Sequence, residues 1–324
     1  MYNKILITGG CGFIGSHFID LALKKKIKIV NLDFLSVGSN KKYSKINSKN
    51  YKFYRVNSIN KLKVKKILEI EKPEVIINFG AETHVDRSII TPKKFIKNNI
   101  EGSLNLAIEF KNFVEKNKIK KYKFIHISTD EVYGSTKKNS FLENQILKPN
   151  SPYSASKAST DLILRAFEKT YKFKSIILRP SNNFGPRQFS EKLIPMAIKQ
   201  LRQGKKIPIY GDGKNKREWI YVEDFVKTIL KIVKSNVNSG IYNIGSGNLI
   251  SNLDLIIHIC KIYSNKNYSK KTILNYFIEF VKDRPGHDFM YKLNLKKAKK
   301  QKFLVNSNFN INLKKTINYF KHSK

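Results

Sequence analysis

Six short apolar runs, each rich in β-branched or aromatic residues, constrain the fold of this chain more than any other feature. The runs are Ile5–Ile7, Ile27–Leu32, Tyr51–Val56, Val75–Phe79, Phe124–Ile127 and Ile176–Leu178. Segments with the helical spacing of apolar residues separate them, so strands and helices are expected to alternate. Near-continuous apolar strands are typical of a parallel sheet that is buried on both faces. With right-handed crossovers, the expected class is α/β with a doubly wound parallel sheet.

A glycine-rich turn follows the first run and reads Thr8-Gly-Gly-Cys-Gly-Phe-Ile-Gly15. Glycines at 9, 12 and 15 allow a tight turn, close approach of the backbone to a pyrophosphate, and close packing of helix on strand. Asp33 ends the second run, 18 residues after Gly15. A carboxylate there accepts from a ribose 2′-hydroxyl and repels a 2′-phosphate. The pattern predicts a Rossmann domain that binds NAD rather than NADP, and a structural turn with a capping aspartate is the minority interpretation.

The alternating pattern breaks after residue 180. Proline, glycine and charged residues gather between Arg187 and Arg217, whereas Trp219–Val233 and Gly240–Ile244 look like a return to the first domain. We therefore expect an NAD-binding domain made of residues 1–180 and 218–248. A smaller C-terminal substrate-binding lobe would consist of residues 181–217 and 249–324.

The charge balance is strongly basic, with 63 Lys and Arg against 24 Asp and Glu. The lysines are spread over the whole chain without a nucleic-acid-binding signature, so we interpret the excess as compositional and expect no specific nucleic-acid partner. No apolar run reaches the roughly 18 residues that span a bilayer. The two cysteines, Cys11 and Cys260, fit a reducing compartment, and no Cys/His spacing suggests a metal. We expect a cytoplasmic protein with no metal and no membrane contact.

Proton-transfer groups concentrate around the fifth run. Thr129, Asp130 and Glu131 come directly after it, and Tyr153 and Lys157 follow four residues apart, one above the other if that segment is helical. A tyrosine with a pKa near 10 becomes a base at neutral pH only if a cation favours its phenolate. The two acids can share one pocket only if the strand ends near Thr129, because successive strand residues face opposite sides. The alternative for the Tyr and Lys is a solvated helix start.

Three more turns are rich in polar residues. Gly80–His84 follows the fourth strand, at the carboxyl edge where open α/β sheets bind ligands. Ser181–Pro186 follows the sixth strand, and Asp283–Asp288 lies near the C-terminus. Each could also be an ordinary surface turn.

Taken together, these motifs resemble the extended short-chain dehydrogenase/reductase superfamily, and within it the nucleotide-sugar 4,6-dehydratases. The supporting segments are Thr129–Gly134, His84–Ser88, Ser151–Ser159, Glu191–Pro195, Pro208–Gly211 and Arg284–Asp288. They occur in family order from residue 4 to about residue 291, so the resemblance covers most of the chain.

The resemblance implies a cycle in which a nucleoside-diphosphate glucose is oxidised at carbon 4, loses water across carbons 5 and 6, and regains hydride at carbon 6. Tyr153 would take the 4-hydroxyl proton, Thr129 would bind the 4-oxygen, and Lys157 would hold the cofactor ribose and lower the tyrosine pKa. Glu131 would remove the proton from carbon 5, and Asp130 would protonate the departing 6-hydroxyl. The two neighbouring carboxyls must then differ in protonation.

Binding residues are implied in the same way. Those for NAD are Gly9, Gly12, Phe13, Ile14, Gly15, Asp33, Asn57, Ser58, Gly80, Ala81, Thr83, Asn98, Tyr153, Lys157 and Asn183. Those for the nucleotide sugar are Thr83, Thr129, Asn182, Lys192, Leu193, Pro208, Tyr210, Arg217, Asn252, Arg284 and His287. Arginine and lysine suit a diphosphate, which is best met by forked and point cations.

Two departures from the family pattern concern recognition. Asn57 replaces the acid that usually contacts adenine, although its side-chain oxygen can still accept, and Phe184 replaces a tyrosine. The resemblance favours dTDP-glucose as substrate, and these departures leave UDP-, CDP- and GDP-hexoses open. A 4-epimerase or decarboxylase is less favoured because it needs no Asp130-Glu131 pair, and a non-enzymatic binding protein is less favoured because the catalytic groups are retained. Helices near 98–116 and 153–170 would, by resemblance, form a four-helix homodimer interface.

Overall fold

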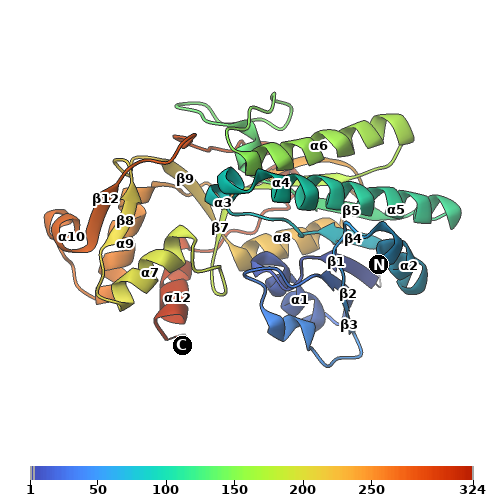
Figure 1. The fold of residues 1–324 in the computed structure, drawn as a ribbon, viewed down its shortest axis with the longest axis horizontal. Helices are drawn as coiled ribbons and strands as arrows, with labels where there is room; N and C mark the ends of the chain where they lie inside the picture. The colour runs from blue at the N-terminus through green and yellow to red at the C-terminus, as the bar shows by residue number, and fades with distance from the viewer. Residues whose placement is uncertain (1, 3, 323–324) are drawn as a thin grey trace.

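The computed structural model describes residues 2 and 4–322, and its centre is a seven-stranded parallel sheet (Figure 1). The strand order is β10-β6-β5-β4-β1-β2-β3. The strands are β1 Lys4–Thr8, β2 Lys28–Asp33, β3 Tyr51–Arg55, β4 Val75–Asn78, β5 Lys123–Ile127, β6 Ile176–Pro180 and β10 Gly240–Ile244. Each of the six apolar runs forms a strand, so the doubly wound α/β class is confirmed.

Helices cover both faces of this sheet, as the near-continuous apolar strands require. Ile5 and Ile7 of β1 face a core with α1 and α8, whereas Leu6 between them faces a second core with α2, α5 and α6. In Figure 1, α5 and α6 run beside each other above the sheet and α1 lies below it. The helices are α1 Phe13–Lys24, α2 Lys61–Glu71, α5 Gly102–Lys116, α6 Pro152–Tyr171 and α8 Val222–Lys234. A π-helical segment, η2 Ile96–Glu101, leads directly into α5.

The rest of the chain forms smaller sheets and helices at the other end of the molecule, on the left in Figure 1. One sheet has the order β11-β9-β7 and another pairs β12 with β8. These strands are β7 Asn182–Phe184, β8 Ile207–Tyr210, β9 Lys216–Tyr221, β11 Leu249–Ser251 and β12 Ile278–Val281. The helices there are α7 Leu193–Arg202, α9 Asn252–Ser264, α10 Lys270–Phe277 and α12 Phe309–His322. They share one apolar core, built around Trp219, Leu255 and Leu313.

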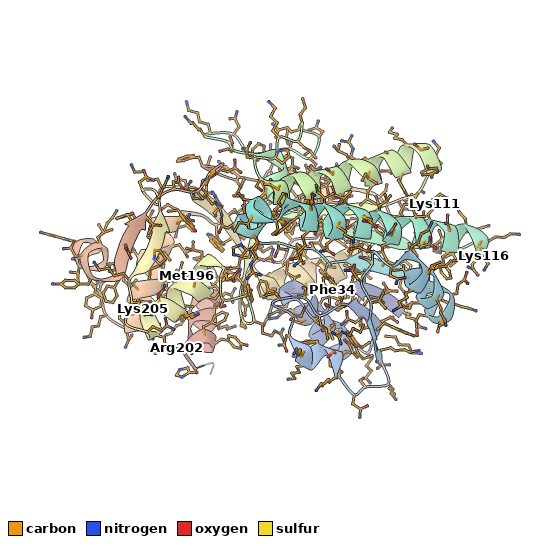
Figure 2. All side chains as sticks on the ribbon, viewed as in Figure 1. Phe34, Lys111, Lys116, Met196, Arg202 and Lys205 are labelled. Atoms are coloured by element: carbon orange, nitrogen blue, oxygen red, sulfur yellow. The ribbon has the colours of Figure 1, made fainter. Side chains whose placement is uncertain are left out.

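Short elements complete the described chain. They are η1 Lys41–Ser44, α3 Val85–Ile90, α4 Pro92–Phe95, η3 Asp130–Tyr133 and α11 Lys296–Lys300. Among the helices described, none has the length and apolar character needed to cross a membrane. Nitrogen tips of basic side chains surround the outline of the molecule in Figure 2, where Lys116 and Lys205 lie at opposite ends.

A buried ion pair fixes α6 against the sheet. Arg179 Nε on β6 lies 2.9 Å from Asp161 Oδ2 on α6, and neither side chain is exposed. Arg179 Nη1 also donates to the Tyr133 hydroxyl, which in turn donates to Asn243 Oδ1 on β10, each at 2.7 Å. Removing one partner of such a pair would leave a buried charge without its partner, so the pair strongly favours this one placement of α6. Asp161 lies one turn beyond Lys157, so the arrangement also fixes the lysine.

Candidate active site

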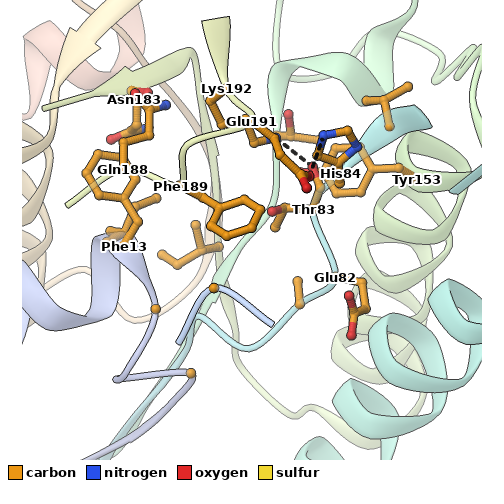
Figure 3. A pocket seen from close by; sticks show the side chains of 18 of the residues that line it. Phe13, Glu82, Thr83, His84, Tyr153, Asn183, Gln188, Phe189, Glu191 and Lys192 are labelled. Carbon is orange, nitrogen blue, oxygen red and sulfur yellow. Dashed lines mark hydrogen bonds and ion pairs between the residues drawn. The ribbon is translucent and has the colours of Figure 1, made fainter. Parts of the chain in front are cut away.

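A cavity of about 470 Å³ lies between the large sheet and the smaller sheets. All six strands from β1 to β6 contribute residues at or just after their carboxyl ends to its wall: Thr8, Asp33, Val56, Phe79, Ser128 and Ser181. Every cofactor, substrate and catalytic residue named under Sequence analysis also lines it. In Figure 3, Phe13, Asn183 and Gln188 lie on one side, Thr83 and Tyr153 lie on the other, and Lys192 lies between them. The structure thus brings the residues selected from the sequence together in one cavity. Which molecule each of them contacts stays a prediction.

The glycine turn packs backbone against backbone. Gly9 has φ +68°, and a Cβ there would lie 2.7 Å from Gly80 Cα. A Cβ at Gly15 would lie 2.4 Å from the Gly9 carbonyl oxygen. Gly12 caps α1 without any side-chain hydrogen bond, so the first amides of this helix face the cavity uncapped. A helix N-terminus of this kind suits a phosphate group.

Asp33 lies at the end of β2 with its carboxylate oriented by two backbone amides. Cys11 N–H donates to Oδ2 at 2.9 Å and Leu35 N–H donates to Oδ1 at 2.8 Å. Burial raises the pKa of Asp33, and these hydrogen bonds act in the opposite direction. Each oxygen keeps acceptor capacity, as a contact with a ribose hydroxyl requires.

The side chain of Asn57 also determines the orientation of the Asn98 side chain. The Ile59 amide donates to its Oδ1 at 3.0 Å, so its NH₂ group must point the other way, where it donates to Asn98 Oδ1 at 3.2 Å. Asn98 must therefore turn its own NH₂ group away from Asn57. A carboxylate at residue 57 could not donate to Asn98 in this way.

The two consecutive acids enter the cavity because the strand has ended before them. β5 stops at Ile127, and Thr129 caps the short helix η3 by accepting the Glu131 amide at 3.3 Å. Thr129 also donates to Asp130 Oδ1 at 3.2 Å. The geometric condition that the sequence imposed on Asp130 and Glu131 is therefore met.

Their environments differ in charge. Burial, with Glu131 and Glu218, raises the pKa of Asp130 well above its ordinary value. Burial also raises the pKa of Glu131, but Lys192, Arg284 and Arg217 oppose the rise. Asp130 Oδ2 is buried and has no hydrogen-bond partner among the described residues. The surroundings thus favour the protonated form more strongly at Asp130 than at Glu131, which is the order that an acid beside a base requires.

Tyr153 and Lys157 lie in the first turns of α6. The helix begins with Pro152 after a capping box in which the Ser151 and Ser154 side chains each accept the other residue's amide. Both catalytic candidates are buried. Burial lowers the pKa of Lys157 to about 8, with Asp161 opposing the shift.

The expected effect of Lys157 on Tyr153 is not found in this structure. Burial raises the pKa of Tyr153 far above 10, the Glu131 charge adds to the rise, and a hydrogen bond with Thr129 opposes it. Lys157 is not among the groups that lower it, so Tyr153 is a neutral phenol here. The desolvation that sequence reasoning left out is the larger effect.

Cations line the part of the cavity formed by the smaller sheets. Lys192, just before α7, donates to the Thr83 carbonyl at 2.8 Å, and Arg284 Nη1 lies 3.4 Å from Asp86 Oδ1. His287 Nδ1 lies 2.6 Å from Asp283 Oδ1. Several buried polar atoms in the wall have no partner among the described residues: Asn183 Oδ1, Gln188 Oε1, Trp219 Nε1 and Asn252 Oδ1. Buried polar groups normally find partners, so these atoms are suited to a bound ligand.

Sequence reasoning missed part of the wall. His84 Nε2 lies 3.0 Å from Glu191 Oε2, and Arg87 pairs with the same carboxylate, which links α3 to the segment before α7 (Figure 3). From these two parts of the chain, the sequence predicts Gly80, Ala81, Thr83, Lys192 and Leu193 as site residues, but not His84, Arg87 or Glu191. Gln188 and Tyr291 also line the cavity, and each lies beside a motif already noticed.

Phe184 does not lie in the wall. It packs against Trp219, Tyr221 and Phe309 in the core of the smaller sheets. Phe184 is an apolar core residue that does not line the cavity, so its identity gives no information on the nucleotide base of the substrate.

Comparisons with known proteins agree with this geometry. The family model described as GDP-mannose 4,6 dehydratase matches residues 6–303. The dTDP-glucose 4,6-dehydratase of Escherichia coli is 36% identical, with 99% of this chain and 94% of the relative covered. The crystal structure of the Streptomyces venezuelae dTDP-glucose 4,6-dehydratase with NAD bound has a TM-score of 0.88 at 32% identity, covering 98% of this chain and 97% of that one. The Bacillus anthracis enzyme in complex with NAD has a TM-score of 0.86 at 35% identity, with 98% and 96% covered. The chain therefore belongs to the nucleotide-sugar 4,6-dehydratase family.

Proposed function

We propose that this protein converts dTDP-glucose to its 4-keto-6-deoxy sugar, with NAD as a cofactor that is regenerated in each cycle. The observation that carries the proposal is the convergence of Asp130, Glu131 and Tyr153 in one cavity beside the glycine turn. An NAD-dependent epimerase would need the tyrosine but no adjacent acid and base. The family membership and the NAD-bound relatives support the same conclusion.

The residues present fit the cofactor. The uncapped N-terminus of α1 would hold the pyrophosphate, Asp33 the adenosine ribose, and Lys157 the nicotinamide ribose. NAD would supply a temporary hydride acceptor for carbon 4 and a hydride donor for carbon 6.

The protein's own groups would move the protons. Tyr153 can take the proton of the 4-hydroxyl only as its phenolate, so its own proton must first leave to solvent, a loss that the positive charge of bound NAD⁺ would favour. Thr129 would turn its hydroxyl from Asp130 to the 4-oxygen. The ketone at carbon 4 acidifies the proton on carbon 5, and Glu131, whose raised pKa is opposed by nearby cations, would remove it. Asp130, kept protonated by burial, gives its proton to the 6-hydroxyl, which leaves as water.

The remaining predictions from the sequence belong to the same proposal. Lys192, Arg217, Arg284 and His287 would hold the diphosphate, and Asn182, Leu193, Pro208, Tyr210 and Asn252 the nucleoside and sugar. Residues 1–180 and 218–248 would act as the NAD-binding domain, and residues 181–217 and 249–324 as the nucleotide-sugar-binding lobe. The site of action would be the cytoplasm.

We also propose a homodimer built from the paired helices η2–α5 and α6. Exposed apolar side chains lie on this side of the molecule: Ile89 and Ile90 on α3, Ile96 on η2 and Leu162 on α6. Each helix would pack against its copy in a four-helix bundle and cover these side chains.

The substrate assignment is tested by incubating the protein with dTDP-, UDP-, CDP- and GDP-glucose and with GDP-mannose, without added cofactor. We expect dTDP-glucose to lose one water, as seen by mass spectrometry. If another nucleotide sugar were dehydrated in preference to dTDP-glucose, the proposed reaction would stand and the proposed nucleotide base would be wrong. A change of configuration at carbon 4 with no loss of water would contradict the dehydratase assignment.

Glu131→Gln should still allow the substrate to reduce bound NAD⁺ but should block elimination, because the amide cannot take the proton from carbon 5. Turnover should fall by roughly 10²- to 10⁴-fold, the usual contribution of a general base. Reduced nicotinamide, followed by its absorbance, should accumulate in a single turnover. Glu279→Gln, on the exposed edge of β12, is the matched control and should turn over normally. Full turnover of Glu131→Gln would remove that residue from its role.

Lys192→Met should shift the acidic limb of the kcat–pH profile to higher pH. Lys192 is the group that most opposes the raised pKa of Glu131, so its loss keeps this base protonated to a higher pH. A shift of about one unit is expected for removal of a nearby opposite charge. The profile of kcat reports the enzyme–substrate complex, which separates this effect from weaker binding. Lys199→Met, on the exposed face of α7, should leave the profile in place, and an equal shift there would refute the local explanation.

Leu162→Glu should convert the dimer to a monomer in sedimentation experiments at micromolar concentration. The leucine is 52% exposed on α6, and a carboxylate there would have to be buried in the four-helix interface. Ile311→Glu is the control, since Ile311 is 56% exposed on α12, among the elements of the smaller sheets. A wild-type protein that sediments only as a monomer would contradict the dimer.

A further inference from the structure

Arg217 is held in the cavity wall by backbone carbonyls rather than by an acid. Its Nη1 donates to the carbonyls of Lys216 at 2.8 Å and Phe289 at 3.2 Å, and its Nη2 donates to that of Asp288 at 2.8 Å. These bonds use three of the five N–H donors of the guanidinium. The other two, on Nε and Nη2, are adjacent and have no partner among residues 2 and 4–322. An arginine in this state keeps its full charge and a forked pair of donors for a ligand.

The ring of Tyr291 forms the surface on which this guanidinium rests. Arg217 Cζ lies 4.5 Å from the ring centroid, within the range of a cation–π contact, and both side chains are more than nine-tenths buried. Tyr291 also lines the cavity. Such contacts are stronger where water is excluded, as it is here.

Asp288 fixes the tyrosine ring in turn. The Tyr291 hydroxyl donates to Asp288 Oδ2 at 2.5 Å, and Asn150 Nδ2 donates to Asp288 Oδ1 at 2.6 Å. Asn150 immediately precedes Ser151, which caps the catalytic helix α6. The carboxylate therefore cannot rotate without breaking a contact to the start of that helix.

From this arrangement we propose that Tyr291, oriented by Asp288, is a positioning residue that holds Arg217 so that its two remaining donors meet the diphosphate of the substrate. The inference rests on the proposed function, since it deepens the role of Arg217 in that site. The three carbonyls bind both N–H groups of Nη1 and one of Nη2 and so fix the plane of the guanidinium. The aromatic ring contacts one face of that plane. Together they leave only the edge with Nε and Nη2 for the ligand.

The test measures binding to the NAD-containing protein by calorimetry. The probes are dTDP, UDP, CDP and GDP, with thymidine as a probe that lacks phosphate. Tyr291→Leu should raise the Kd of the preferred diphosphate by roughly 3- to 30-fold, the range of a cation–π contact, and should leave the binding of the free nucleoside unchanged. Tyr291→Phe keeps the ring and loses only the hydrogen bond to Asp288, so its Kd should lie between those of the wild type and Tyr291→Leu.

Two further variants distinguish positioning from a general loss of structure. If Tyr291 acts through Arg217, the double variant Tyr291→Leu/Arg217→Lys should bind no more weakly than Arg217→Lys alone. Tyr242 is the matched control, because it is equally buried, lies outside the cavity and has Lys297 Nζ at 4.5 Å from its ring. Tyr242→Leu should lower the unfolding midpoint and leave the Kd unchanged.

Wild-type affinity in Tyr291→Leu, or additive losses in the double variant, would overturn the positioning role while the proposed function stands. A wild-type protein that binds none of the four diphosphates would overturn both.

Discussion

Burial of both faces of the large sheet is the constraint on which the rest of the structure depends. Successive residues such as Ile5 and Leu6 face separate cores, so the strands have no solvent-facing side on which to carry a site. Polar side chains within the sheet are bound to one another or to the covering helices, as where Thr8 donates to Asn78 and Asn78 donates to Ser103 on α5. Ligand chemistry is therefore restricted to the carboxyl ends of the strands, where six of them meet one cavity.

Both catalytic carboxyls are subject to the same effect of burial, and their neighbours make their pKa values differ. Both Asp130 and Glu131 are removed from water, which by itself would keep both protonated. The charged neighbours differ. Lys192, Arg284 and Arg217 act to lower the pKa of Glu131, whereas the neighbours of Asp130 are mainly other acids, which raise its pKa. Cations that would bind the substrate diphosphate thus also prepare the base. Substrate recognition and proton abstraction share one set of charges.

Much of this could be predicted from the sequence because the signals are local. β-branched runs gave the strands, the glycine turn gave the start of α1, and a Tyr four residues before a Lys gave the face of α6. The fate of Asp130 and Glu131 was also predictable, since only an ended strand lets neighbours share a pocket. The pKa of Tyr153 was not, because desolvation depends on every segment that packs around it.

The roles of Tyr291, Glu191 and Gln188 were not predictable for a similar reason. Tyr291 stacks on Arg217 and Glu191 pairs with His84, both distant in sequence, and Gln188 lies in a turn that contacts His17 of α1 through the Pro186 carbonyl. Phe184 shows the converse, since a residue inside a strong motif can serve only the core. Motifs locate a segment, but the side chains that reach the cavity depend on tertiary packing.

The amide pair Asn57–Asn98 has a consequence for how cofactor recognition can change over evolution. Because the Ile59 amide fixes which end of Asn57 faces Asn98, the identity of residue 57 sets whether Asn98 turns a donor or an acceptor away from it. A single codon change from asparagine to aspartate at residue 57 would make Asn98 turn its NH₂ group, instead of its oxygen, toward residue 57. Asn98 lies 41 positions away in the chain, and its own codon would be unchanged. A substitution at residue 57 is therefore expected to change the group that Asn98 presents to the cofactor while residue 98 stays the same.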